Sequence, residues 1–268
     1  MDNNNHNRNK DRYKQPLRER EDDDGSLIIG RNPVTEALKA GLPIDTLYID
    51  PSAGGSIGHI RALAKERGIV VKDADDRKLS KMCRGASHQG VAAIGACAEY
   101  AEIDDIFKAA EDKGEDPFII ICDEIEDPHN LGAIIRTAET AGAHGVIIPK
   151  RRSASLNYTV FKTSAGAASY VPVARVANLA SALDELKERG VWIYGTDGSG
   201  QDYSGVTMTG PVGLVIGSEG FGMGRLIKEK CDFLLKLPMA GKITSLNASV
   251  AAGIFMYEIV RQRRAAKG

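Results

Sequence analysis

Three stretches of glycine and other small residues stand out in the last third of this sequence. They cover residues 194–200, 216–222 and 237–247, and each ends a short apolar run (191–194, 212–216 and 233–237). The apolar runs have the length and composition of buried β-strands. Open α/β sheets bind their ligands at the carboxyl ends of the strands. We therefore expect the three stretches to meet around one ligand.

Two of these stretches carry polar side chains that could act on such a ligand. Glu219 lies between Ser218 and Gly220, where flexible glycines can bring a loop close to a bound molecule, although a turn carboxylate in water is the simpler interpretation. Ser245 and Asn247 lie at the expected start of the last helix. Capping of that helix explains one of these two polar residues, but hardly both.

Arg136 is a further candidate, in a stretch that predicts a helix over residues 131–141. Asn130 occupies the expected N-cap position, and Gly142 supplies the other end. On this helix Arg136 shares a face with small residues at i−4, i−3 and i+4 (Gly132, Ala133 and Thr140). A surface arginine more often has an acidic partner at such spacing. The pattern indicates a hollow around the guanidinium, with a solvated arginine as the alternative.

Several common sites are excluded by spacing. Gly241-Lys242 is followed by Ile243, and residue 236 is lysine rather than glycine, so a P-loop is absent. The expected strand 118–122 runs into the stretch 123–127, whose four carboxylates would repel a dinucleotide's pyrophosphate. This acidic run could attract a hard cation, but we interpret it as a solvated loop. The cysteines and histidines lack metal-ligand spacing, so no metal site is predicted.

The charge balance leaves nucleic-acid binding to local patches. The 268 residues carry a net charge of −1, so no global basic field exists. One basic cluster, Lys150, Arg151 and Arg152, follows the expected strand 145–148, and Arg31, Arg84 and His88 provide similar groups near the front of the chain. A solvated face is the alternative for both. No 18-residue apolar stretch is present, so neither a signal peptide nor a membrane span is predicted, and the scattered cysteines favour buried thiols in the cytoplasm.

The organisation of the chain follows from its hydrophobic pattern. Residues 1–25 are polar and are expected to form a disordered tail. Residues 26–99 predict a small αβα domain, with strands at 27–29, 47–49, 69–71 and 91–94 and helices beginning near residue 32 and at 60–67 and 77–83. Residues 100–116 are acidic and helix-prone, and we interpret them as a linker. Residues 117–268 alternate strands and helices, which predicts a largely parallel sheet covered by helices. The remaining strands are expected at 171–173 and in the runs above, and the remaining helices at 157–165, 179–189, 224–231 and 245–264.

Three blocks of sequence carry a resemblance to a known family. Residues 127–136, 216–220 and 237–247 occur in order and resemble the three motifs of the SpoU (TrmH-type) RNA ribose 2′-O-methyltransferases. The similarity is greatest to the RlmB-like branch, which methylates a guanosine ribose in large-subunit ribosomal RNA. Residues 29–34 and 87–90 are similar to that branch's substrate-binding domain, which resembles ribosomal protein L30e. Only the tail lies outside the resemblance.

The resemblance implies a fold, a cofactor and site residues. It implies a SPOUT-type parallel sheet with a C-terminal trefoil knot, S-adenosylmethionine as methyl donor, and a homodimer acting on ribosomal RNA. The implied catalytic positions are Asn130, Arg136, Glu219, Ser245 and Asn247, with Arg136 facing the ribose hydroxyl at the dimer interface. The implied cofactor contacts are Gly195, Thr196, Gly198, Ile216, Gly217, Ser218, Gly220, Leu237, Met239 and Leu246.

Two other functions remain open at this point. The chain could be a transfer RNA ribose methyltransferase of the same fold, although such enzymes often lack the front domain. It could also be a non-catalytic RNA-binding or ribosome-assembly protein, against which the intact motifs argue.

Overall fold

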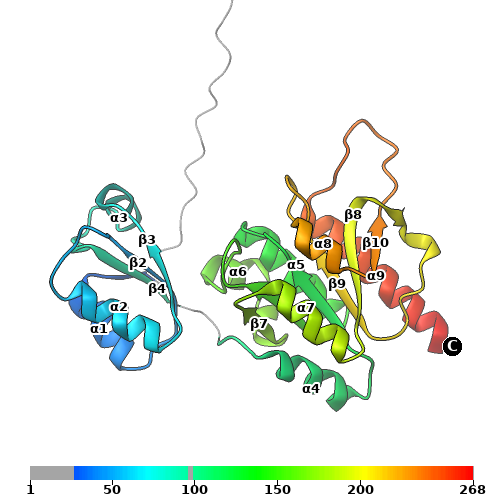
Figure 1. The fold of residues 1–268 in the computed structure, drawn as a ribbon, viewed down its shortest axis with the longest axis horizontal. Helices are drawn as coiled ribbons and strands as arrows, with labels where there is room; N and C mark the ends of the chain where they lie inside the picture. The colour runs from blue at the N-terminus through cyan, green and yellow to red at the C-terminus, as the bar shows by residue number, and fades with distance from the viewer. Residues whose placement is uncertain (1–26, 96–98, 268) are drawn as a thin grey trace, which may run out of the picture.

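The computed structural model describes residues 27–95 and 99–267, which form two α/β domains joined near residue 100 (Figure 1). The tail expected over residues 1–25 lies outside the described residues. The front domain contains a four-stranded sheet in the order β1-β4-β2-β3, with β2 and β3 parallel and the other pairs antiparallel. Its strands are Leu27–Ile29 (β1), Ile44–Ile49 (β2), Val70–Asp73 (β3) and Val91–Gly95 (β4).

The helices of the front domain bury apolar side chains on both sides of this sheet. The helices Arg31–Lys39 (α1) and Ile57–Glu66 (α2) contribute Val34 and Ile60 to a core that also contains Leu47. The helix Asp76–Met82 (α3) contributes Leu79 to a second, smaller cluster. The predicted αβα arrangement of this part of the chain is therefore present.

The second domain is built on a six-stranded parallel sheet in the order β10-β8-β9-β5-β6-β7. The central strands β5 and β9 are buried at every position, as expected for strands that helices cover on both faces. The sequence-based prediction of a parallel sheet is confirmed. The strands are Phe118–Cys122 (β5), Gly145–Pro149 (β6), Val173–Val176 (β7), Trp192–Asp202 (β8), Val212–Ile216 (β9) and Phe233–Lys236 (β10).

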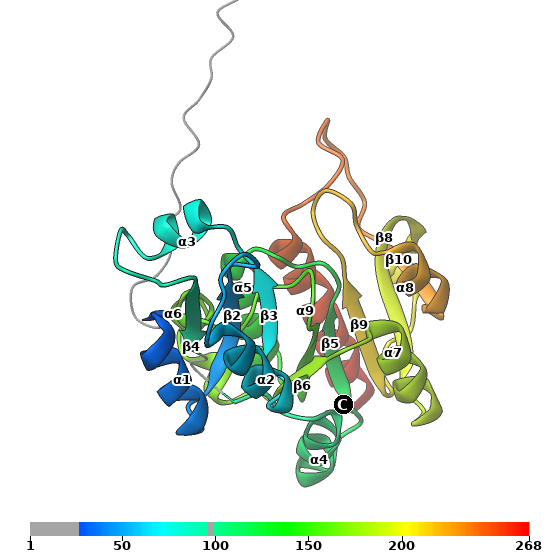
Figure 2. The same cartoon turned by 60° about the vertical axis from the view of Figure 1, so that its left-hand side comes forward.

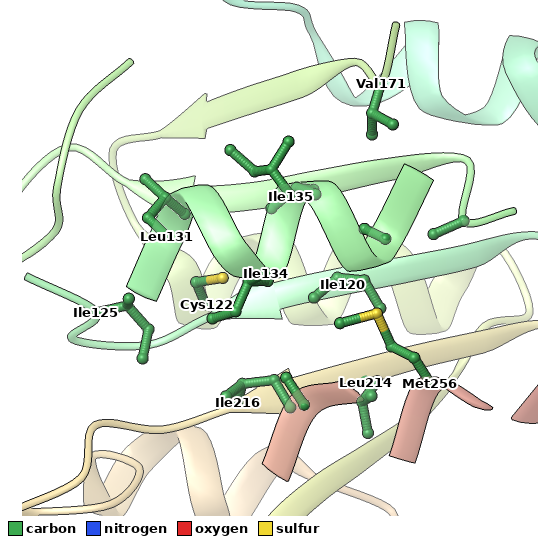
Figure 3. Packing of buried hydrophobic residues seen from close by; sticks show 14 of the residues in the cluster. Ile120, Cys122, Ile125, Leu131, Ile134, Ile135, Val171, Leu214, Ile216 and Met256 are labelled. Carbon is green, nitrogen blue, oxygen red and sulfur yellow. The ribbon is translucent and has the colours of Figure 1, made fainter. Parts of the chain in front are cut away.

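Two layers of helices cover this sheet. One layer contains Pro128–Thr140 (α5), Tyr158–Thr163 (α6) and Ala248–Lys267 (α9), and Figure 3 shows Leu131 and Ile134 of α5 and Met256 of α9 packed with strand residues. The other layer contains Ile103–Lys113 (α4), Leu179–Glu188 (α7) and Arg225–Lys230 (α8). Short 3₁₀ turns occur at Ala167–Ser169 and Tyr203–Gly205.

The segment that we interpreted as a linker contains α4, which belongs to the second core. Ile103 and Ile106 are buried there, and a Cβ atom on Gly145 would lie 2.4 Å from the Ile106 side chain. The close fit of α4 against β6 therefore requires glycine at position 145. The amphipathic spacing in this segment reflects packing against the sheet.

The first glycine-rich stretch differs from its expected form as a loop after a strand. It lies within β8, which is 11 residues long, and it bulges out of the ladder with β10: Leu234 pairs with Gly195, whereas Leu235 pairs with Gln201. A Cβ atom on Gly200 would lie 2.5 Å from the backbone of Leu234. The glycines therefore permit close strand contact on both sides of a bulge, which their composition alone does not distinguish from a loop.

Candidate functional site

A hollow of about 650 Å³ lies where the three glycine-rich stretches meet, beside the ends of β9 and β10. The segment between β10 and α9 projects beyond the sheet at this end in both Figure 1 and Figure 2. Eight of the ten predicted cofactor residues line the hollow: Thr196, Gly198, Ile216, Gly217, Ser218, Leu237, Met239 and Leu246. The expectation that the three stretches converge on one cavity is thus met by the geometry.

The backbone of the second stretch forms part of the cavity wall. Ser218 and Gly222 exchange two backbone hydrogen bonds, with N···O distances of 3.0 and 2.9 Å. A Cβ atom on Gly217 would lie only 2.3 Å from the carbonyl carbon of Gly222. Only glycine fits at position 217, and its main-chain groups are therefore free of side-chain cover.

Two predicted cofactor residues, Gly195 and Gly220, do not line the hollow. Gly195 is buried beneath it, where an added Cβ would lie 2.6 Å from Cys231 Sγ and 2.7 Å from Met223 Cε. It supports the cavity by allowing close packing of β8 against these side chains. Gly220 is exposed at the tip of the turn between Ser218 and Gly222.

A hydrogen-bonded network at the hollow joins Glu219, Asn130 and Asn247, which come from three separate segments of the chain. The amide Nδ2 of Asn130 donates to Glu219 Oε1 at 2.9 Å, and Asn247 Nδ2 donates both to Asn130 Oδ1 at 2.9 Å and to Glu219 Oε1. The backbone N–H of Ala248 also donates to Glu219 Oε1, at 3.2 Å. The carboxylate of Glu219 therefore fixes the starts of α5 and α9 against the turn that forms the cavity wall.

Asn247 has a second role as the N-cap of α9. Its Oδ1 accepts hydrogen bonds from the backbone N–H groups of Ser249 and Val250, at 3.0 and 3.3 Å. Ser245 lies before the helix and lines the hollow. Capping therefore accounts for Asn247, while Ser245 remains available to a ligand.

The predicted N-cap role of Asn130 is wrong. The N-cap of α5 is Asp127, whose Oδ1 accepts from the N–H of His129 at 3.1 Å, and Pro128 occupies the first helical position. Proline is favoured there because its fixed φ suits the helix and the missing N–H is not needed. The helix starts three residues earlier than we predicted, which leaves the Asn130 amide free to join the network.

Arg136 does not join this network within one chain. It is exposed, and its guanidinium has no hydrogen bond or ion pair with the residues that the structure describes. It lies six positions after Asn130 on α5, which is about 9 Å along the helix axis. One chain therefore brings together Asn130, Glu219, Asn247 and Ser245, and leaves the fifth predicted catalytic residue elsewhere on its surface.

Asp123 supports the site and was not identified from the sequence. It is buried, its Oδ2 accepts from the N–H of Gly224 at 2.7 Å, and burial raises the pKa of its carboxyl. This bond anchors the segment that follows the Ser218–Gly222 turn. The position of Asp123 directly after the buried Cys122 was the available signal, but we interpreted the whole acidic run as solvated.

The basic residues predicted to contact RNA fall into two groups. Lys150, Arg151 and Arg152 follow β6, and Arg152 Nη1 pairs with Glu124 at 2.8 Å. In the front domain, Arg31 and His88 line a second hollow of about 460 Å³. Arg84 lies directly before the glycine at position 85 that also borders this hollow, and it adopts a left-handed backbone conformation with φ of 49°.

His88 has a structural environment within that second hollow. Its side chain is 9% exposed, its Nδ1 accepts from the N–H of Gly90 at 3.1 Å, and its Nε2 lies 3.1 Å from Ser80 Oγ. Arg31 is more accessible, and its Nε donates to the carbonyl oxygen of Gln89 at 2.8 Å. The imidazole thus braces the turn that holds Arg31 in place.

The described parts of the chain contain neither a metal-ligating cluster nor a helix suited to cross a membrane. Over residues 27–95 and 99–267, no three metal-ligating side chains come together as a group that could hold an ion. None of the helices within these ranges combines the length and apolar character that a membrane crossing requires.

Comparisons with known proteins agree with the geometry of both domains. Residues 117–257 match the model of the SpoU rRNA Methylase family, and residues 27–101 match that of an RNA 2′-O ribose methyltransferase substrate-binding domain. A Bacillus subtilis (strain 168) protein, YacO, assigned to the TrmH family of tRNA/rRNA methyltransferases, is 55% identical over 88% of this chain and 95% of its own length.

Two solved structures extend the comparison. The AdoMet-bound rRNA methyltransferase from Sinorhizobium meliloti aligns with a TM-score of 0.55 and 27% identity, over 88% of this chain and 87% of that one. The A. aeolicus TrmH/SpoU tRNA modifying enzyme aligns with a TM-score of 0.52 and 30% identity, over 57% of this chain and 78% of that one. With the three glycine-rich stretches assembled around one hollow and both domains matched, this chain belongs to the SpoU methylase family of RNA methyltransferases.

Proposed function

We propose that this protein uses S-adenosylmethionine to methylate the 2′-hydroxyl of a guanosine ribose in large-subunit ribosomal RNA. The observation that carries the proposal is the hollow of about 650 Å³ formed by the three glycine-rich stretches, with the network of Asn130, Glu219 and Asn247 at its edge. Its volume suits a small-molecule ligand. The match of residues 27–101 to a 2′-O ribose methyltransferase substrate-binding domain supports ribose as the acceptor.

The residues around the hollow fit S-adenosylmethionine. The wall at Gly217 presents main-chain groups that can hydrogen-bond the adenosine and methionine parts, and Leu237, Met239 and Leu246 offer apolar contacts. When bound, the cofactor supplies an electrophilic methyl group on a sulfonium. We place Thr196, Gly198, Ile216 and Ser218 among its contacts, and Gly195 and Gly220 as residues that shape the cavity from outside it.

The chain's own residues then position the acceptor. Methyl transfer requires the 2′-oxygen in line with the methyl carbon and the loss of the hydroxyl proton as the new bond forms. Arginine is nearly always charged, so Arg136 orients and polarises the hydroxyl and a nearby phosphate rather than serving as a simple base. The proton leaves to phosphate, to water or to a transiently neutral guanidine. Asn130 holds Arg136 or the ribose, while Glu219 and Ser245 shape the pocket.

The separation of Arg136 from the network supports a site completed by a second subunit. An apolar stripe on α9 is exposed beside α5: Val250 is 51% exposed, Ile254 38% and Tyr257 50%. These residues follow helical spacing, and α9 contacts α5 where Gly253 approaches Thr137. We propose that a second copy covers this stripe, so that Arg136 of one subunit faces the network of the other in a homodimer.

Mixing two inactive variants tests this composite site. Arg136→Ala and Glu219→Gln should each be inactive alone, yet a mixed dimer contains one site with both residues intact. Random mixing should restore roughly a quarter of the wild-type activity, because half of the dimers are mixed and each has one working site of two. No recovery after verified subunit exchange would contradict the composite site, and near-normal turnover by Arg136→Lys would contradict the role of Arg136.

Ribosomal RNA is preferred over transfer RNA because of the front domain. The ribosomal RNA enzyme from Sinorhizobium meliloti covers 88% of this chain, whereas the tRNA modifying enzyme covers 57%. Methyl transfer to purified ribosomal RNA and transfer RNA, followed by mapping of the modified ribose, separates the two substrates. Calorimetry that detected no S-adenosylmethionine binding would instead favour a non-catalytic RNA-binding or ribosome-assembly protein. The trefoil knot, the L30e-like character of the front domain and a cytoplasmic location belong to the same proposal.

A further inference from the structure

A buried ion pair connects the two domains. Arg175 in β7 of the second domain donates from Nη1 to Asp45 Oδ1 in β2 of the front domain, at 2.6 Å. The Asp45 side chain is fully buried, and that of Arg175 is only 9% exposed. Both charges are therefore removed from water where the two domains meet.

Tyr100, at the junction of the domains, completes the polar cluster. Its hydroxyl donates to Asp45 Oδ1 at 2.7 Å and accepts from the backbone N–H of Leu156 at 2.9 Å. The Arg175 guanidinium lies 4.8 Å from the centre of the Tyr100 ring, a favourable cation–π distance. The other oxygen of Asp45 accepts from Thr46 Oγ1 at 2.6 Å. Burial raises the pKa of Tyr100, so its hydroxyl stays a neutral donor.

The desolvation cost of this cluster indicates that it fixes the relative position of the two domains. Desolvation of two charges often cancels their attraction, so a buried pair adds little net stability over apolar residues of similar volume. Its hydrogen bonds form only in one arrangement, however, and a shifted domain would leave buried charges unpaired. The cluster therefore penalises any other packed placement of the domains, in which Asp45 and Arg175 would be buried without each other.

The same contacts extend to the basic residues that follow β6. Leu156 lies shortly after the basic cluster of residues 150–152, and the N–H of Lys150 donates to the carbonyl of Val176, the neighbour of Arg175, at 2.8 Å. The front domain, whose hollow is lined by Arg31, is thus connected to the segment that carries the basic residues 150–152.

We propose that Asp45, Tyr100 and Arg175 form an interdomain latch that holds the front domain at a fixed position relative to the methyl-transfer site. The latch selects RNA long enough to contact both domains at once, because only a fixed spacing lets the second contact follow the first at high effective concentration. This role rests on the proposed RNA methylation, in which the front domain binds substrate.

The test compares Asp45→Asn with a matched change away from the domain boundary. Asp73→Asn serves as the control, because Asp73 also pairs with an arginine, Arg61, at 2.7 Å, but on the exposed surface of the front domain. A double variant, Asp45→Asn with Arg175→Met, removes both charges and avoids an unpaired buried arginine. Tyr100→Phe removes only the bridging hydroxyl.

Small-angle X-ray scattering of the full-length protein without RNA measures the domain arrangement. We expect a narrow pair-distance distribution for the wild type and Asp73→Asn, and a broader distribution for Asp45→Asn and the double variant. A broad distribution in the wild type, or an unchanged distribution in the double variant, would overturn the latch. This readout does not depend on activity, so it decides the latch even if no RNA is methylated.

Steady-state kinetics then test substrate selection. With a long ribosomal RNA fragment, the latch variants should show a KM about tenfold higher, an unchanged kcat and unchanged S-adenosylmethionine affinity, because the second contact then forms at a lower effective concentration. With a short oligonucleotide that spans only the methylated nucleotide, KM should match the wild type. Equal losses on both RNAs, or no change on the long RNA, would refute selection by length.

Discussion

The dual role of Asn247 allows its effects on stability and on catalysis to be separated. Its Oδ1 caps α9 through the N–H groups of Ser249 and Val250, while its Nδ2 holds Glu219 and Asn130. Alanine removes both functions. Serine keeps an oxygen that can cap the helix. Its side chain is too short to reach the network, and it lacks the amide donor.

The expected magnitudes follow from these contacts. Loss of an N-cap costs about 1 kcal/mol, so Tm of Asn247→Ala should lie roughly 2–4 °C below that of Asn247→Ser, which loses the same network bonds but keeps a capping oxygen. A hydrogen bond to a charged group contributes about 1.5–3 kcal/mol, and the exposure of Glu219 places this one at the low end. Both variants should therefore lose roughly tenfold in kcat, since 1.4 kcal/mol corresponds to a factor of ten.

Three measurements on the same preparations check this reasoning: thermal unfolding, calorimetric S-adenosylmethionine binding and single-turnover methylation of ribosomal RNA. We expect the kcat losses of the two variants to be equal although their stabilities differ. If Asn247→Ser methylates at the wild-type rate while Asn247→Ala is slow, Asn247 acts only as a helix cap, and the catalytic importance assigned to the network is refuted.

Three further predictions concern the cofactor site, RNA binding and pH. Gly217→Ala should abolish S-adenosylmethionine binding by calorimetry, because its Cβ would lie 2.3 Å from the Gly222 backbone, whereas Gly198→Ala, with nothing within 4 Å, should bind within about threefold of the wild type. Arg151→Ala should weaken RNA binding at low salt and reduce the slope of log affinity against log salt by about 1, as measured by filter binding, without affecting cofactor affinity. Burial lowers the pKa of His144 below 6.5, and its Nδ1 accepts from a backbone N–H at 3.0 Å, so the unfolded chain takes up this proton first as pH falls. The His144 contribution to stability is thus present above pH 6.5 and is lost as pH falls below it. The free energy of unfolding, measured with urea between pH 5 and 8, should therefore decline less at low pH for His144→Asn than for the wild type.

Much of the second domain could be predicted because its strands are short apolar runs bounded by small residues. The runs 118–122 and 212–216 match β5 and β9 residue for residue, since strands buried on both faces need apolar residues at every position. The pattern fails where apolar periodicity has two explanations. Ile103 and Ile106 suit an amphipathic linker helix or a helix packed on a sheet, and only the glycine at position 145 on β6, far along the chain, makes the second arrangement possible.

Local chemistry also left the helix start near Asn130 ambiguous. Asp127 and Asn130 are both good N-cap residues, and Pro128 is compatible with either a turn before the helix or the first helical position. The structure uses Asp127 and Pro128 to begin the helix, so Asn130 is spared for the network. The residues alone thus suggested capping for Asn130, whereas the family resemblance implied a catalytic position, because capping and ligand positioning require the same side-chain groups.

Glu219 shows what the sequence motifs do not contain: they include the residue, but its hydrogen-bond partners are set by the tertiary fold. The sequence places Glu219 in a glycine turn, where its carboxylate has no local partner. In the fold, one of its oxygens accepts from Asn130, Asn247 and the N–H of Ala248, so it also lies at the positive ends of two helices, α5 and α9. Three chain segments far apart in sequence are thereby locked together at the cavity. Within the described residues Arg136, about two turns along α5, has no such partner, and the homodimer that we propose would supply one across the exposed apolar stripe of α9.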